Sequence, residues 1–137
     1  MTPVIRRIVA VVLSCGVAII IVRLLEELAR QVTMPAGLDP TNAAQMKTAL
    51  EHGEFPFASL ALVFCGWLLA SYTGSRIASQ VGQARIAPLI FTVLFTLVIL
   101  HDLTALPHPT WMWIGGVFGV PLVALGAAGE TITFRTL

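Results

Sequence analysis

Residues 8–22 read IVAVVLSCGVAIIIV, fifteen positions without a charged side chain. They follow Arg6 and Arg7 directly, and the charged stretch RLLEELAR comes next. An apolar segment over about residues 8–25 approaches the roughly 20 residues that a helix needs to cross about 30 Å of hydrocarbon. Two arginines before an apolar run are also typical of a signal peptide, but the run is long for one and no A-x-A cleavage site follows. We therefore expect an uncleaved membrane-spanning helix.

The composition of the whole chain supports this interpretation. Its 137 residues are 57% hydrophobic and only 11% charged, whereas soluble domains are about 25% charged. Further apolar stretches at about 57–75, 86–103 and 111–129 have the length of a membrane span. Because a backbone in lipid must form its hydrogen bonds internally, we predict an all-α fold, a single membrane domain built as a four-helix bundle. The bilayer is then its main surrounding, and the net charge of +1 does not indicate a nucleic-acid partner.

The distribution of basic residues predicts an orientation. One side of the predicted spans carries five of them: Arg6, Arg7, Arg76, Arg85 and Arg135. The other side carries Arg23, Arg30 and Lys47 together with six of the seven acidic residues. Cytoplasmic loops of membrane proteins carry an excess of lysine and arginine. We therefore predict a multi-pass protein of the bacterial inner membrane with both termini in the cytoplasm.

The long outer loop, about residues 29–56, contains a helix signal. Asp39 suits an N-cap and Pro40 a first helical position, TNAAQMKTALEH follows, and Gly53 can end the helix. The apolar positions of this stretch fall on one face. We expect a short helix over about residues 40–52, half buried at the membrane interface.

Small residues recur at helical spacing in two predicted spans. Gly66, Ala70 and Gly74 are four residues apart, as are Gly115 and Gly119. Such stripes let neighbouring helices approach closely in lipid. They either pack the helices of one bundle or form a seam between copies, and the sequence leaves both open. In the last span, Pro121 predicts a kink.

Ionisable residues gather at the predicted outer ends of the spans. LLEEL at residues 24–28 and ILHDL at residues 99–103 each follow an apolar run, which would place them at equal depth. Charged groups at that depth are costly unless they are paired or hydrated. We name the candidate site residues of this region the outer polar layer: Glu26, Glu27, His101, Asp102 and His108. Arg23 and Glu54 are expected beside it.

One interpretation of the outer polar layer is purely structural. Arg23 would pair with Glu26, Glu27 or Asp102. Arg23 with Glu27, and Glu26 with Arg30, also have the four-residue spacing at which ion pairs stabilise a helix.

Two functional interpretations stay open beside it. His101, His108 and a carboxylate are ligand types that suit zinc, although their spacing is not that of H-E-x-x-H. A histidine and a carboxylate could instead gate a proton or solute pathway. Such a pathway needs polar groups deeper in the bundle, where the sequence offers only hydroxyls.

The sequence contains no pattern typical of an enzyme. It has no G-x-S-x-G, no phosphate-binding loop and no H-E-x-x-H, so no catalytic residue is assigned. The favoured function is a non-enzymatic membrane protein that acts through helix packing, as a self-associating unit or a subunit of a larger complex. The alternative is a small transporter or a metal-binding protein that uses the outer polar layer.

Two short segments carry a family resemblance. PAGLDP at residues 35–40 and PHPTW at residues 107–111, with four spans, resemble a group of small bacterial inner-membrane proteins. The resemblance implies location and topology but no activity. Members of that group close their first helix with an acidic residue and often a histidine. Glu26 and Glu27 match the acid, whereas residues 28–30 lack the histidine, so the resemblance does not imply a shared metal site.

Overall fold

The computed structural model describes residues 2–39 and 41–133, and these residues form helices and connecting loops without a strand. Pro40 and Arg135, which entered the predictions above, lie outside the described residues. The helices are α1 (Pro3–Thr33), α2 (Ala43–Glu51), α3 (Phe57–Gly82), α4 (Ile86–Ala105), α5 (Thr110–Ile114), the π-helical η1 (Gly115–Gly119) and α6 (Val120–Thr133). The prediction of an all-α fold with four long apolar helices is confirmed, because α1, α3, α4 and the segment Thr110–Glu130 are long and apolar enough to span a membrane.

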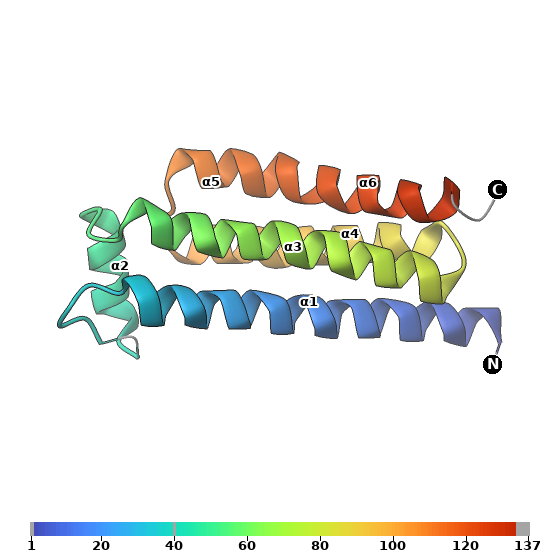
Figure 1. Ribbon diagram of the computed structural model, residues 1–137, viewed down its shortest axis with the longest axis horizontal. Coiled ribbons are helices and arrows are strands. Elements are labelled where there is room, and N and C mark those ends of the chain that lie inside the picture. Colours follow the sequence, from blue (N-terminus) through green and yellow to red (C-terminus); the bar gives the residue numbers. More distant parts are fainter. Residues whose placement is uncertain (1, 40, 134–137) are drawn as a thin grey trace.

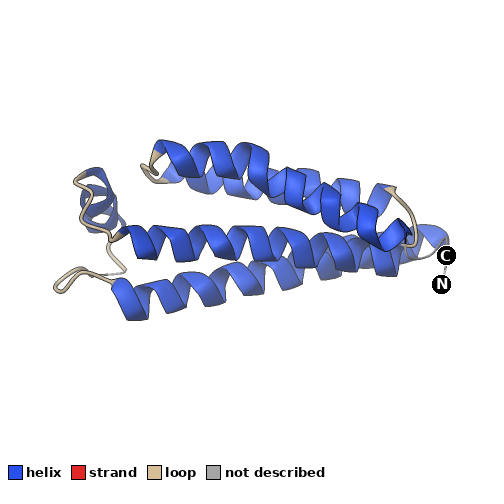
Figure 2. Cartoon of the chain, turned by 45° about the horizontal axis from the view of Figure 1, so that its top comes forward, coloured by secondary structure: helices blue, strands red, loops and turns tan. Residues whose placement is uncertain are grey.

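The long helices lie side by side as a bundle (Figure 1). α3 packs against α1, α4 and α6, and α1 lies on the side of α3 away from α6. α2 lies beyond one end of the bundle, whereas α1 begins and α6 ends at the opposite end, as both views show (Figures 1 and 2). We therefore refer to the α2 end and the termini end of the bundle.

The first helix is longer than predicted. α1 starts at Pro3, with the Thr2 hydroxyl accepting a hydrogen bond from the Ile5 N–H, and runs for 31 residues. At 1.5 Å per residue it is about 46 Å long, which exceeds the roughly 30 Å of a hydrocarbon core. The charged stretch at residues 23–30 is thus a continuous part of the helix, and its side chains are held at fixed angles around the helix axis.

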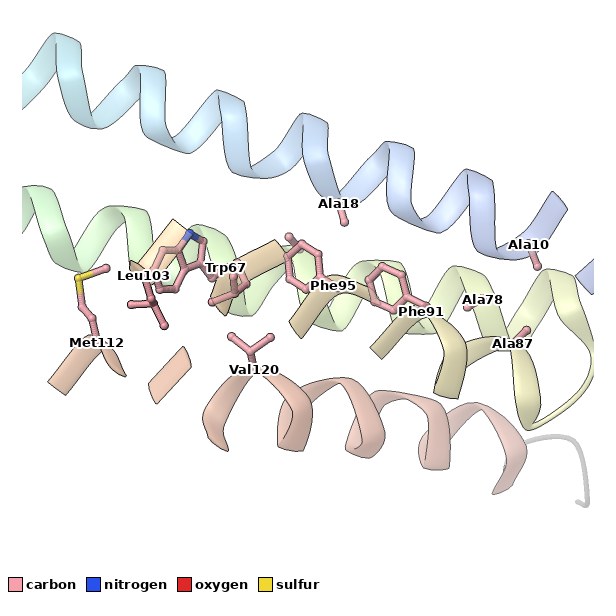
Figure 3. Close-up of a cluster of buried hydrophobic side chains, with 12 residues drawn as sticks. Ala10, Ala18, Trp67, Ala78, Ala87, Phe91, Phe95, Leu103, Met112 and Val120 are labelled. Carbon is pink, nitrogen blue, oxygen red and sulfur yellow. The ribbon is translucent and has the colours of Figure 1, made fainter. Parts of the chain in front are cut away.

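Aromatic rings fill the centre of the bundle (Figure 3). Trp67 from α3 and Phe91 from α4 are fully buried, and Phe91 stacks on Phe95 with ring centroids 5.5 Å apart. Small residues face these rings. A Cβ atom at Gly74 would lie 2.2 Å from Phe91 Cζ, so the ring occupies the space that a glycine leaves free.

The predicted packing residues all contact helices of the same chain. A Cβ at Gly66 would meet Leu25 at 3.0 Å, one at Gly115 would meet the Phe64 ring at 2.3 Å, and one at Gly119 would meet Leu68 at 3.9 Å. Ala70 is fully buried. These stripes are therefore used inside the bundle.

A π-helical turn precedes Pro121, where the sequence predicts a kink. The Val120 N–H donates to the Gly115 carbonyl, five residues back instead of four. A proline has no N–H, and its ring crowds the carbonyl four residues earlier. One widened turn of helix relieves this crowding while the helix continues into α6.

The N-cap of α2 differs from the prediction. Asn42 caps the helix, because its Oδ1 accepts from the N–H groups of Ala44 and Gln45 at 3.1 and 3.2 Å. The prediction of Asp39 as the N-cap is wrong. Asp39 instead accepts two hydrogen bonds from Thr41, at 2.7 Å from the hydroxyl and 2.9 Å from the N–H. These bonds favour the charged carboxylate and lower the pKa of Asp39 below its usual range.

Candidate binding site at the α2 end of the bundle

The structure brings part of the outer polar layer together around a cavity between α1 and α4. Arg23 and Glu26 of α1 face His101 and Asp102 of α4 across a space of about 310 Å³. Trp67 of α3 also lines it. We call this space the α1–α4 cavity.

A second cavity lies next to it, on the side of α2. It has a volume of about 290 Å³ and is lined by His108 and by Met46 and Leu50 of α2, among others. Arg23, Glu26 and Asp102 line both cavities. These three side chains therefore stand between the α1–α4 cavity and the space beneath α2.

One of the predicted ion pairs on α1, Arg23 with Glu26, is present, whereas the two with four-residue spacing are not. Arg23 donates to Glu26 at 3.3 Å, and Arg30 donates to Glu27, so both pairs are three residues apart. The predicted four-residue pairs, Arg23–Glu27 and Glu26–Arg30, are wrong. Gln31 also donates to Glu27, at 3.0 Å. The interactions of Glu27 thus lie along its own helix, and this residue lines neither cavity.

The lining of the α1–α4 cavity carries a net negative charge when its carboxyl groups are ionised. Arg23 contributes +1, and Glu26 and Asp102 contribute −1 each, which sums to −1 when histidine is neutral. Among the described residues, no cation lies within 4.0 Å of Asp102. The lining of this cavity therefore disfavours an anion.

Glu54, expected beside the outer polar layer, and His108, expected within it, both lie apart from the α1–α4 cavity. Glu54 lies in a hollow beside α2, with Leu38 and Thr48, instead of joining the layer. His108 lines only the second cavity, and its Nδ1 lies 3.0 Å from the Leu106 carbonyl oxygen. A carbonyl can only accept, so Nδ1 carries the hydrogen and the ring is held to its own turn.

The geometry does not support the zinc interpretation. In the described part of the chain, no three His, Cys, Asp or Glu side chains are grouped so that they could hold a metal ion. His101 lines the α1–α4 cavity and His108 only the second one. A structural or catalytic zinc needs at least three protein ligands.

A pathway through the bundle is not supported either. The hydroxyls of Ser14, Ser71 and Thr92 each donate to a backbone carbonyl, at 2.6, 2.6 and 2.7 Å. Below the cavity, the stacked rings of Phe91 and Phe95 occupy the centre. These three hydroxyls therefore stabilise helices, whereas the buried Oγ1 of Thr96 has no hydrogen-bond partner among the described residues.

Trp67 is the site residue that the sequence analysis missed. Its side chain is 0% exposed, and none of the described residues accepts a hydrogen bond from its indole Nε1–H. In Figure 3 the indole nitrogen lies on the side of the ring that faces α1, where the cavity is. A tryptophan inside an apolar span, away from the interface where tryptophan is enriched, is the signal that could have found it.

Comparison with known proteins finds no matching family model, curated protein or solved structure. The functional proposal therefore depends on the geometry of this site.

Proposed function

We propose that this chain is a four-span protein of the bacterial inner membrane with both termini in the cytoplasm. The even number of spans and the basic residues at the termini end, Arg6, Arg7, Arg76 and Arg85, support this orientation. α2 then lies on the extracytoplasmic surface, and its apolar residues Met46 and Leu50 cover the second cavity.

Reporter fusions test this orientation. A green fluorescent protein fused after Leu137 is expected to fluoresce, because this reporter matures in the cytoplasm. Alkaline phosphatase inserted after Gly37, an exposed turn at positive φ, is expected to be active, because this enzyme needs the oxidising extracytoplasmic side. A green fluorescent protein without fluorescence at the C-terminus, together with an inactive alkaline phosphatase after Gly37, would contradict the proposed orientation.

We further propose that the protein acts without catalysis, by binding a small molecule in the α1–α4 cavity. The observation that supports this most strongly is the buried indole N–H of Trp67 at the cavity wall. A buried donor without an acceptor costs about 1–3 kcal/mol, and such a cost is recovered when a ligand supplies the acceptor. Ionisable residues that face the interior of a membrane bundle mark a functional site by default, and Glu26 and Asp102 line the same cavity as Trp67.

Native mass spectrometry of the protein extracted from its membrane tests this binding. We expect a small molecule to remain bound to the wild type and its occupancy to fall about 5- to 10-fold in Trp67→Phe, which keeps an aromatic ring but removes the donor. Trp113→Phe is the matched control, because Trp113 lines neither cavity. A wild type that carries no small molecule, or equal losses in both variants, would refute the proposal.

Association with a second copy or a larger complex, the function that the sequence favours, is the second candidate. The small-residue stripes are used within the bundle, so we propose that α1 carries this contact. Only Ala10, Ser14, Ala18 and Ala29 are buried on its 31 residues. Its exposed side chains are largely aliphatic, among them Val12, Ile20 and Leu24, and lipid or another helix can pack on them.

A further inference from the structure

We propose that the ligand of the α1–α4 cavity is the head group of a membrane quinone, a neutral ring with two carbonyl oxygens. This inference depends on the proposed binding function and names the class of its ligand. Four properties of the cavity lead to it: a fixed donor at its inner wall, an opening toward lipid, a rim that disfavours anions, and a volume suited to one ring.

The inner wall selects an acceptor atom. The indole N–H of Trp67 is a donor that cannot also accept, and its side chain is fully buried with no acceptor among the described residues. Figure 3 shows the nitrogen on the α1 side of the ring. A carbonyl oxygen is the neutral acceptor that fits such a position. An ammonium group placed there would bring its own N–H donors against the indole N–H.

The opening of the cavity faces lipid. Ile19 of α1 and Val98 of α4 both line it, and both are about half exposed, at 49% and 52%. Phe95 and Ile99 line it from the buried side, with exposures of 3% and 1%. A ligand can therefore enter between α1 and α4 from the bilayer, place a ring against Phe95, and leave an apolar tail among the lipids.

The rim excludes anionic head groups but offers donors. Glu26 and Asp102 outweigh Arg23, so a phosphate or carboxylate would meet a net charge of −1. Arg23 has donors beyond the one that it gives to Glu26, and a His101 ring nitrogen can donate as well. Either group can receive the second carbonyl of a quinone.

The size of the cavity agrees with a single ring system. About 310 Å³ is at the lower end of the range for small-molecule pockets, roughly 300–1,000 Å³. A one- or two-ring head group fits such a volume when its tail lies outside. A quinone head group is neutral and lipid-soluble and carries two carbonyl acceptors, so it agrees with all four properties of the cavity.

Photolabelling tests this assignment on the full chain in lipid nanodiscs. The probe is an azido derivative of decylubiquinone, with unlabelled decylubiquinone and menadione as competitors. We expect labelling within residues 19–26 and 95–102, lost when either competitor is in excess. Decanoate and decyltrimethylammonium, which carry the anionic and cationic alternatives on a similar tail, should not compete at equal concentration.

Two variants make the assignment specific. Trp67→Phe is expected to weaken decylubiquinone binding about 5- to 10-fold, the loss of one buried hydrogen bond, whereas Trp113→Phe leaves it unchanged. Val98→Trp is expected to abolish labelling, because the larger ring fills the opening, and Leu97→Trp is its control. Leu97 is similarly exposed, at 56%, but does not line the cavity.

The outcomes separate this inference from the proposed function. If a small molecule co-purifies but decylubiquinone and menadione do not bind, the quinone assignment is overturned while the binding function stands. The same holds if the decanoate or ammonium competitor displaces the probe. Full decylubiquinone affinity in Trp67→Phe would also overturn it. If no small molecule co-purifies and no probe binds, both proposals fail.

Discussion

Gly74→Leu is expected to prevent most of the protein from folding. A Cβ at position 74 would lie 2.2, 2.6 and 2.9 Å from three atoms of the Phe91 ring. That ring is fully buried and stacked on Phe95, so it cannot swing aside. Overpacking a core costs about 1–3 kcal/mol even for small additions, and leucine adds a whole branched side chain to a protein whose total stability is about 5–15 kcal/mol.

Size-exclusion chromatography of a mild detergent extract, followed by a thermal unfolding scan, measures this effect. The matched control is Gly16→Leu, at an exposed position of α1 where an added Cβ would meet no atom within 4 Å. The double variant Gly74→Leu/Phe91→Ala should recover part of the folded yield, because the smaller side chain returns space. A Gly74→Leu yield equal to that of Gly16→Leu would show that the close contact is absent.

The same pair of variants separates folding from association. Because Gly74 packs against Phe91 of its own chain, an oligomer lost in Gly74→Leu reports unfolding and not a broken seam. Gly16→Leu leaves the chain folded and adds bulk to the exposed face of α1. If it removes an oligomer that the wild type forms, α1 is the association surface. An unchanged oligomer would count against α1 at that position.

The spans could be predicted because hydropathy averages over many residues. Each of the four segments keeps its apolar character for a length close to a bilayer thickness, so no single residue decides it. Boundaries depend on fewer residues and were less accurate. α1 continues through its charged stretch to Thr33. Two good cap residues, Asp39 and Asn42, lie within four positions before α2, and the helix uses Asn42.

The site was predictable only in part, for geometric reasons. Glu26, His101 and Asp102 meet because their helices reach the same depth, and depth can be counted along a sequence. Glu27 does not join them. Successive residues of a helix point about 100° apart, so Glu27 points in a different direction from Glu26, which lines the cavity. For Trp67 the sequence shows only its position inside an apolar span, since whether its N–H finds an acceptor depends on three helices at once.

Removing two buried serine hydroxyls is expected to loosen the contact between α3 and α6. Ser71 donates to the Val120 carbonyl at 2.6 Å, and Ser75 donates to the Ala124 carbonyl at 2.5 Å, one helical turn further. Hydrogen bonds between membrane helices contribute about 0.6 kcal/mol on average and about 1.7 kcal/mol at most. The double variant Ser71→Ala/Ser75→Ala should therefore lose about 1–3 kcal/mol of unfolding free energy.

Ser79→Ala is the matched control, because it removes the same hydroxyl from the same helix. Ser79 is also buried, but its hydroxyl donates to the Arg76 carbonyl of α3 itself, at 3.0 Å. Reversible unfolding with sodium dodecyl sulfate gives the free energies of all variants. The two inter-helix hydrogen bonds join α3 to α6 directly after the π-helical turn. Three of the five residues of η1 are glycines, so this turn offers few side chains that could pack against α3. Equal losses in Ser79→Ala and in the double variant would mean that the hydroxyls stabilise α3 alone.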